Sequence, residues 1–206
     1  MTSRHAPTKN LGLTALLGAA SFTSSLIVLQ VARSDIDWTR HYVSDFANGS
    51  LGWVFVLGVL VHGFGNLALS LGLRRSLDPG PLRTGAVVLL AVAVAGIVGA
   101  ALFPIDSAFS SPTRAGLAHR AFVGVSFPLE LAALLLFSAA FTRHARWRPY
   151  SRTSFVLSAI SAVALTGLLL AVLLNQLPGL AERLALASFL AWEFWAAFHL
   201  AGPLLD

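Results

Sequence analysis

Six apolar windows, each long enough to cross a lipid bilayer, constrain this chain more than any other feature of its sequence. A bilayer core about 30 Å thick requires about 20 residues of α-helix. Windows of this length lie at residues 11–32, 51–73, 84–103, 121–141, 153–174 and 184–201. The alternating segments of about 10 residues that are typical of a membrane β-barrel do not occur. Because backbone groups in lipid must be hydrogen-bonded within their own segment, the windows predict an all-α bundle of six transmembrane helices.

The composition agrees with a membrane protein and excludes a soluble one. Hydrophobic residues make up 56% of the 206 residues and charged residues 11%, whereas soluble domains carry about 25% charged residues. A soluble fold of this size could not cover so much apolar surface. The formal net charge of +5 does not predict nucleic-acid binding, because the basic residues lie between the apolar windows. The chain has no cysteine, which excludes disulfides and thiolate chemistry.

The distribution of basic residues predicts that both termini are cytoplasmic. Nine of the fourteen arginines and lysines flank the windows on the side of the termini, and five lie on the opposite side. Short cytoplasmic loops carry the excess of these residues. We therefore expect a multi-pass protein of the cytoplasmic membrane, with cytoplasmic tails at residues 1–10 and 202–206 and a single transmembrane domain at 11–201. The use of thirteen arginines against one lysine is typical of a GC-rich bacterium.

The first window is expected to remain in the protein as a helix rather than to act as a cleaved signal peptide. Its apolar run is longer than the 7 to 15 residues of a typical signal-peptide core. No cleavage motif of small residues follows it, because Gln30 and Ala32 precede Arg33.

Small and aromatic residues predict how the helices pack. Gly96 and Gly99 in the third window, and Ser154, Ser158 and Ser161 in the fifth, allow helices to approach closely. Tryptophans near the window ends are predicted to be anchors at the membrane interface, and these are Trp38, Trp53 and Trp147.

Five polar residues on the side opposite the termini form the first candidate site. Ser44, Asp45, Asp106, His119 and Arg183 lie at the ends of the windows or just beyond them. Two carboxylates and an imidazole are ligand types for a divalent metal, so Asp45, Asp106 and His119 are predicted metal ligands. A metal held there would activate water to hydrolyse a lipid headgroup or a similar ester.

The same residues fit two further interpretations, which the sequence leaves open. Without a metal, His119 oriented by Asp106 would act as a general base and Ser44 as a nucleophile. Asp45 and Arg183 would then bind the ligand. Alternatively all of them are structural: the two aspartates cap helix starts or turns, and Arg183 forms an interfacial ion pair with an aspartate.

Four short elements in this region resemble a known family. The string RHYVSDFANG at residues 40–49 looks like an "ISD-x-G" element, and FPID at 103–106 is similar to an "FP-x-D" element. His119 and the string GLAER at 179–183 match the remaining landmarks. In order and spacing, over about residues 11–200, the chain resembles a prokaryotic membrane family called domain of unknown function 998. The resemblance implies a six-helix membrane protein with no established activity.

Three ionisable residues at the centres of predicted spans form a second candidate site. His62, Glu130 and Glu193 lie near the middle of the second, fourth and sixth windows. An ionisable group at that depth costs on the order of 2.5–3.5 kcal/mol on insertion scales and normally faces the bundle interior. We therefore expect the three to meet and to bind a ligand or protons. The alternative is that Glu130 is protonated and hydrogen-bonds His62 or Asn66, which would contribute about 1 kcal/mol to helix association.

Three functions remain open from the sequence. The favoured one is a pocket on the extracytoplasmic half that binds or hydrolyses a lipid or another amphiphilic small molecule. A second is a small transporter or proton-coupled carrier that uses His62, Glu130 and Glu193. A third is a structural or regulatory membrane protein without chemistry of its own. Membrane lipids are expected partners in all three.

Overall fold

The computed structural model describes residues 5–106 and 111–202 and is built from six long α-helices and two short 3₁₀ helices. The long helices are α1 (His5–Ala32), α2 (Gly52–Ser76), α3 (Pro81–Leu102), α4 (Arg114–Phe141), α5 (Ser151–Leu174) and α6 (Pro178–Ala201). The short ones are η1 (Val43–Ala47) and η2 (Arg148–Tyr150). All six long helices are apolar and long enough to cross a membrane. The predicted all-α, six-helix architecture is thereby confirmed.

Three helices, α1, α4 and α6, begin six or seven residues before the windows that predicted them. Helix α4 begins at Arg114 rather than at residue 121, because the Thr113 hydroxyl caps it by accepting a hydrogen bond from the Gly116 amide at 3.0 Å. Helix α6 begins at Pro178 rather than at residue 184, and proline suits the first position of a helix. Polar first turns lower the local hydropathy, which is why apolar windows start too late.

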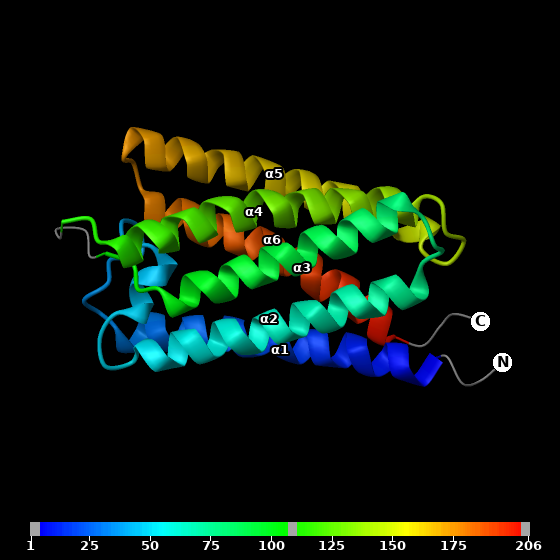
Figure 1. Ribbon diagram of the computed structural model, residues 1–206, viewed down its shortest axis with the longest axis horizontal. Coiled ribbons are helices and arrows are strands. Elements are labelled where there is room, and N and C mark those ends of the chain that lie inside the picture. The colour runs from blue at the N-terminus through cyan, green and yellow to red at the C-terminus, as the bar shows by residue number, and fades with distance from the viewer. Residues whose placement is uncertain (1–4, 107–110, 203–206) are drawn as a thin grey trace.

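The helices form one elongated bundle in which each packs against its neighbours in the sequence, and α1 and α2 also pack against α6 (Figure 1). Both described ends of the chain lie at the same end of the bundle, as an even number of spans requires. We call this the terminal end. The opposite end holds η1 and the starts of α2, α4 and α6, and we call it the loop end.

An aromatic core fills the bundle toward the terminal end. The Phe141 ring stacks on Trp147 with centroids 4.5 Å apart and lies 6.4 Å from the Trp192 ring. Trp147 is buried, and its indole nitrogen donates a hydrogen bond to the Ser76 hydroxyl at 3.1 Å. The prediction of an interfacial anchor is therefore wrong for Trp147, whereas Trp38 and Trp53 are exposed. Trp147 differs from Trp38 and Trp53 because its indole nitrogen has a polar partner, Ser76, inside the bundle.

Buried hydroxyl groups join α4, α5 and α6. Ser138 hydrogen-bonds Ser154 at 2.6 Å and Ser158 at 3.2 Å, and the Trp192 indole nitrogen donates to Ser154 at 2.9 Å. The small side chains allow close approach, and their hydroxyls satisfy one another away from water. The predicted packing role of the serines in α5 is confirmed.

Gly65 offers a test of the contact between α1 and α2. A Cβ atom placed on Gly65 would lie 2.9 Å from the Cα atom of Gly18, so Gly65→Ala forces two backbones apart. We expect a loss of about 1–3 kcal/mol in the free energy of unfolding. The matched control is Gly124→Ala, where a Cβ atom would meet nothing within 4 Å. It should be neutral or gain about 0.5–1 kcal/mol, because alanine favours helix. Thermal unfolding in detergent distinguishes them, and equal effects would contradict the packing.

The cytoplasmic placement of the terminal end remains a prediction, and the absence of native cysteine makes it easy to test. Trp38 is exposed at the loop end and Pro79 is exposed at the terminal end. A membrane-impermeant maleimide should label a Trp38→Cys variant in intact cells. A Pro79→Cys variant should react only after the membrane is permeabilised. The reverse pattern would invert the topology.

Candidate functional site

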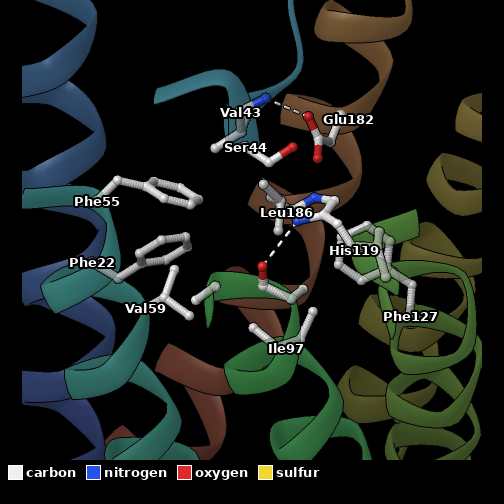
Figure 2. A pocket seen from close by; sticks show the side chains of 13 residues that line it. Phe22, Val43, Ser44, Phe55, Val59, Ile97, His119, Phe127, Glu182 and Leu186 are labelled. Carbon is white, nitrogen blue, oxygen red and sulfur yellow. Dashed lines mark hydrogen bonds between the residues drawn. The ribbon is translucent and has the colours of Figure 1, made fainter. Parts of the chain in front are cut away.

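A cavity with about 410 Å³ of empty volume, part of it open to solvent, lies inside the bundle near the loop end (Figure 2). Most of its wall is apolar, and the apolar lining includes Phe22, Phe55, Val59, Ile97, Phe127 and Leu186. Three polar side chains also line it, and these are Ser44, His119 and Glu182. Figure 2 shows the Ser44 hydroxyl and the Glu182 carboxyl on the side of the cavity beneath η1. A mostly apolar cavity with a few polar groups is the usual form of a small-molecule site.

Helix η1 covers the cavity because a carboxylate of α6 holds its first turn. The Val43 amide donates a hydrogen bond of 2.5 Å to Glu182 Oε2, and both residues are buried. The Tyr42 amide donates to Asp45 Oδ2 at 2.8 Å. Val43 and Phe46 face the core, and Ser44 is thereby turned into the cavity wall.

The start of α6 packs directly against the backbone that precedes η1. A Cβ atom on Gly179 would overlap the backbone of His41, so only glycine allows this approach. The Leu180 amide donates a hydrogen bond to the Thr39 carbonyl at 3.1 Å. These two contacts fix the distance between the loop and α6.

Arg183 joins three segments of the loop end. Its guanidinium donates to the His41 carbonyl at 2.8 Å and to Gln30 Oε1 at 3.0 Å, and it lies 5.7 Å from the centroid of the Phe46 ring. It thus hydrogen-bonds carbonyl oxygens rather than the aspartate that the structural interpretation predicted. Arg183 positions η1, and its role as a ligand-binding residue stays a prediction.

His119 is buried in the cavity wall with a defined orientation. Its Nδ1 atom lies 2.9 Å from the carbonyl oxygens of both Ala100 and Phe103. Two carbonyl acceptors require that Nδ1 carries the hydrogen, so Nε2 of the neutral ring presents a lone pair. The predicted orienting partner, Asp106, is therefore replaced by backbone carbonyls from the end of α3.

Asp106 instead closes the connection between α3 and α4. Its carboxylate accepts hydrogen bonds from the Thr113 hydroxyl at 2.6 Å, from the Thr113 amide at 3.2 Å and from Arg120 at 2.9 Å. The hydrogen bonds from Thr113, together with Arg120, hold the pKa of Asp106 below its usual value. The capping interpretation predicted contacts to residues 107–111, most of which lie outside the described residues. The observed role is to fix the start of α4.

The predicted metal set is not assembled. Across residues 5–106 and 111–202, no three His, Asp or Glu side chains are placed to hold a metal ion. The physical reason is that Asp45 accepts a hydrogen bond from the Tyr42 amide, whereas Asp106 is held by Thr113. Burial raises the pKa of Asp45 above its ordinary value. The structure gives no support to a divalent metal on Asp45, Asp106 and His119.

The second candidate site is brought together as expected. His62 Nε2 lies 2.7 Å from Glu193 Oε2, and the Asn66 amide donates to Glu193 Oε1 at 2.6 Å. Glu130 lies against the same Glu193 carboxyl. We call His62, Asn66, Glu130 and Glu193 the midplane cluster. Glu193, rather than Glu130, is the partner of His62 and Asn66, which corrects the predicted pairing.

Residues 16–199 match the family described as Protein of unknown function (DUF998). The chain belongs to this family. No curated protein and no solved structure matches it.

The four elements that suggested the family all lie at the loop end of this DUF998 protein. Residues 40–49 contain η1, residues 103–106 lead to α4, and His119 and the start of α6 complete the set. Ser44, His119 and Glu182 from these elements line one cavity. The landmarks therefore build the cavity and its cover.

Three residues that line the cavity were not among the predicted site residues, and these are Phe22, Phe55 and Glu182. Glu182 also holds η1. The spacing of Glu182, Leu186 and Glu193 at i, i+4 and i+11 was the available signal, because it places all three on one face of α6.

The low pKa of Asp106 predicts a pH-dependent contribution to stability. Because its folded-state pKa is below the ordinary value of 3.8, the contribution is present above that pH and is lost as the pH falls through the folded-state pKa. Asp106→Asn should lower the unfolding temperature at neutral pH and flatten its fall in acid. Asp78→Asn, which removes an exposed carboxylate at the terminal end, is the control and should keep the wild-type profile. Identical acid profiles for the Asp106→Asn protein and the wild type would refute this role.

Proposed function

We propose that this DUF998 protein binds an amphiphilic molecule in the cavity beneath η1. The apolar part of the ligand would pack against Phe22, Phe55 and Phe127, and its polar group would lie beside Ser44 and Glu182. The observation that carries the proposal is the combination of an apolar wall with polar side chains gathered beneath η1 (Figure 2).

The polar groups favour a ligand that donates hydrogen bonds. Glu182 uses one oxygen to hold Val43 and keeps the other for the cavity, and His119 offers the lone pair of Nε2. A carboxylate or phosphate headgroup would place a second negative group beside the buried Glu182, which is costly at low dielectric. A hydroxyl or a protonated amine is therefore the preferred headgroup.

Binding explains the geometry better than hydrolysis does. In the described part of the chain, no hydrogen bond joins Ser44 to His119, and no carboxylate orients the imidazole. A nucleophile and base must lie within hydrogen-bond reach. The two backbone hydrogen bonds of His119 Nδ1 hold the ring, so we propose His119 as a recognition group rather than a base.

A photoactivatable long-chain alcohol tests the proposed ligand class on the full-length protein in phosphatidylcholine nanodiscs. We expect the alcohol to label cavity residues, and a fatty acid of equal length to label them about tenfold less, equivalent to about 1.4 kcal/mol. Glu182→Gln should narrow that difference, because it removes the buried negative charge.

The matched controls lie on α3. Ile97→Trp should fill the cavity and suppress labelling, whereas Val92→Trp adds the same ring to an exposed position and should leave labelling intact. Equal labelling of the two variant proteins would mean that the probe binds the lipid-facing surface, and the proposed site would be abandoned.

A further inference from the structure

The midplane cluster lies one helical turn beyond the floor of the cavity. Val59 lines the cavity and precedes His62 by three residues on α2, and Phe127 precedes Glu130 by three residues on α4. Three residues of α-helix rise about 4.5 Å. Phe22 connects the two regions, because its ring lines the cavity and stacks on His62 with centroids 4.8 Å apart and planes 12° apart.

The contact between Glu130 and Glu193 requires a proton. Ionised carboxylates only accept hydrogen bonds, so two of them cannot bond to one another. Glu130 is 7% exposed and Glu193 is 3% exposed, and two negative charges in contact at such a site repel strongly. Glu193 already accepts a hydrogen bond from Asn66 and pairs with His62. Glu130 is thus the group left to carry the proton, and its Oε1 atom is buried without a hydrogen-bond partner among the described residues.

The other described titratable side chains of the bundle lie away from this pair. On α1, α3 and α5, the charged side chains that the structure describes are Lys9, Arg83 and Arg152, all in the opening turns at the terminal end. On α2, α4 and α6, the remaining titratable side chains lie toward the helix ends. Toward the loop end, Arg120 and Arg183 are 10 residues from Glu130 and Glu193 along their helices, and the cavity-lining His119 and Glu182 are 11 residues away.

Access to the cluster is one-sided. Toward the terminal end, α2, α4 and α6 present Leu69, Leu134 and Ala196, which are at most 1% exposed. The ring of Phe137 lies 6.0 Å from that of Trp192 in the same layer. Toward the loop end, only the cavity floor separates the cluster from a space that opens to solvent.

We propose that the midplane cluster is a proton-binding site in which Glu130 and Glu193 share one exchangeable proton, and that this proton enters and leaves through the cavity past Phe22. A hydronium ion from the solvent that reaches the cavity transfers its proton to a Glu130 carboxylate oxygen and becomes water, and the reverse step releases the proton. His62 and Asn66 stabilise the charge that remains on Glu193. The site does not depend on any ligand in the cavity.

Infrared spectroscopy of the full-length protein in detergent tests the shared proton, because the C=O band of a protonated carboxyl group shifts in D2O. Spectra at pH 7 are compared in a Glu182→Gln background, which removes the third buried carboxyl group of the described residues. The background protein should show the band, and adding Glu130→Gln should abolish it. The glutamine amide at position 130 can donate a hydrogen bond to Glu193, which should preserve the fold. Asp106→Asn is the matched control and should leave the band unchanged.

Two further results decide the proton site even if Glu130→Gln impairs folding. Glu193→Gln leaves Glu130 protonated beside an amide, so the band should persist at a shifted frequency. A background protein without the band, a band that survives Glu130→Gln, or a band unaltered by Glu193→Gln would overturn the proposal.

The route is tested by the rate at which the band shifts after transfer to D2O. Phe22→Leu should accelerate the shift, because it thins the floor between the cavity and His62. Phe137→Leu makes the same change on the closed side and should leave the rate slow. Equal acceleration by both variants, or a larger effect of Phe137→Leu, would overturn the proposed route.

Discussion

The hydrogen bond from the Val43 amide to the Glu182 carboxylate is the interaction on which the loop end depends. It joins residues 139 positions apart in the chain and holds η1 over the open end of the bundle. It holds the backbone of η1 beside the cavity that Ser44 and His119 line. The backbone amide of Val43 gives this buried carboxyl group a hydrogen-bond donor, which offsets part of the cost of its burial.

The fold was predictable because lipid leaves the backbone few choices. A run of about 20 apolar residues must be helical, so the number, order and approximate ends of the spans followed from hydropathy alone. The predicted starts of α4 and α6 were less accurate, because Thr113 and Pro178 favour a helix start through local geometry that hydropathy does not detect. Trp147 was misplaced for a similar reason: its burial depends on Ser76, a partner 71 residues away.

The candidate site was predicted only in outline. The sequence indicated which polar residues lie at the loop end, but every local contact there depends on the course of the backbone. Asp106 accepts a hydrogen bond from Thr113, and the His119 ring hydrogen-bonds two carbonyl groups at the end of α3. The three midplane residues met as expected because the cost of exposing them to lipid drives them into the interior. Their pairing was not predictable, since it depends on the relative rotation of α2, α4 and α6.

The contacts of Glu193 with His62 and Asn66 indicate that Glu130 does more than hold helices together. His62 and Asn66 of α2 already join α6 through Glu193, so the contact between these helices is complete without a second acid. Glu130 adds a carboxyl group with one oxygen unpaired within the described residues, and burial of an unpaired polar group costs free energy. Helix association alone would be served better by a leucine or a glutamine at this position. A group that holds a proton next to a cavity accounts for the cost, because only an acid can release that proton.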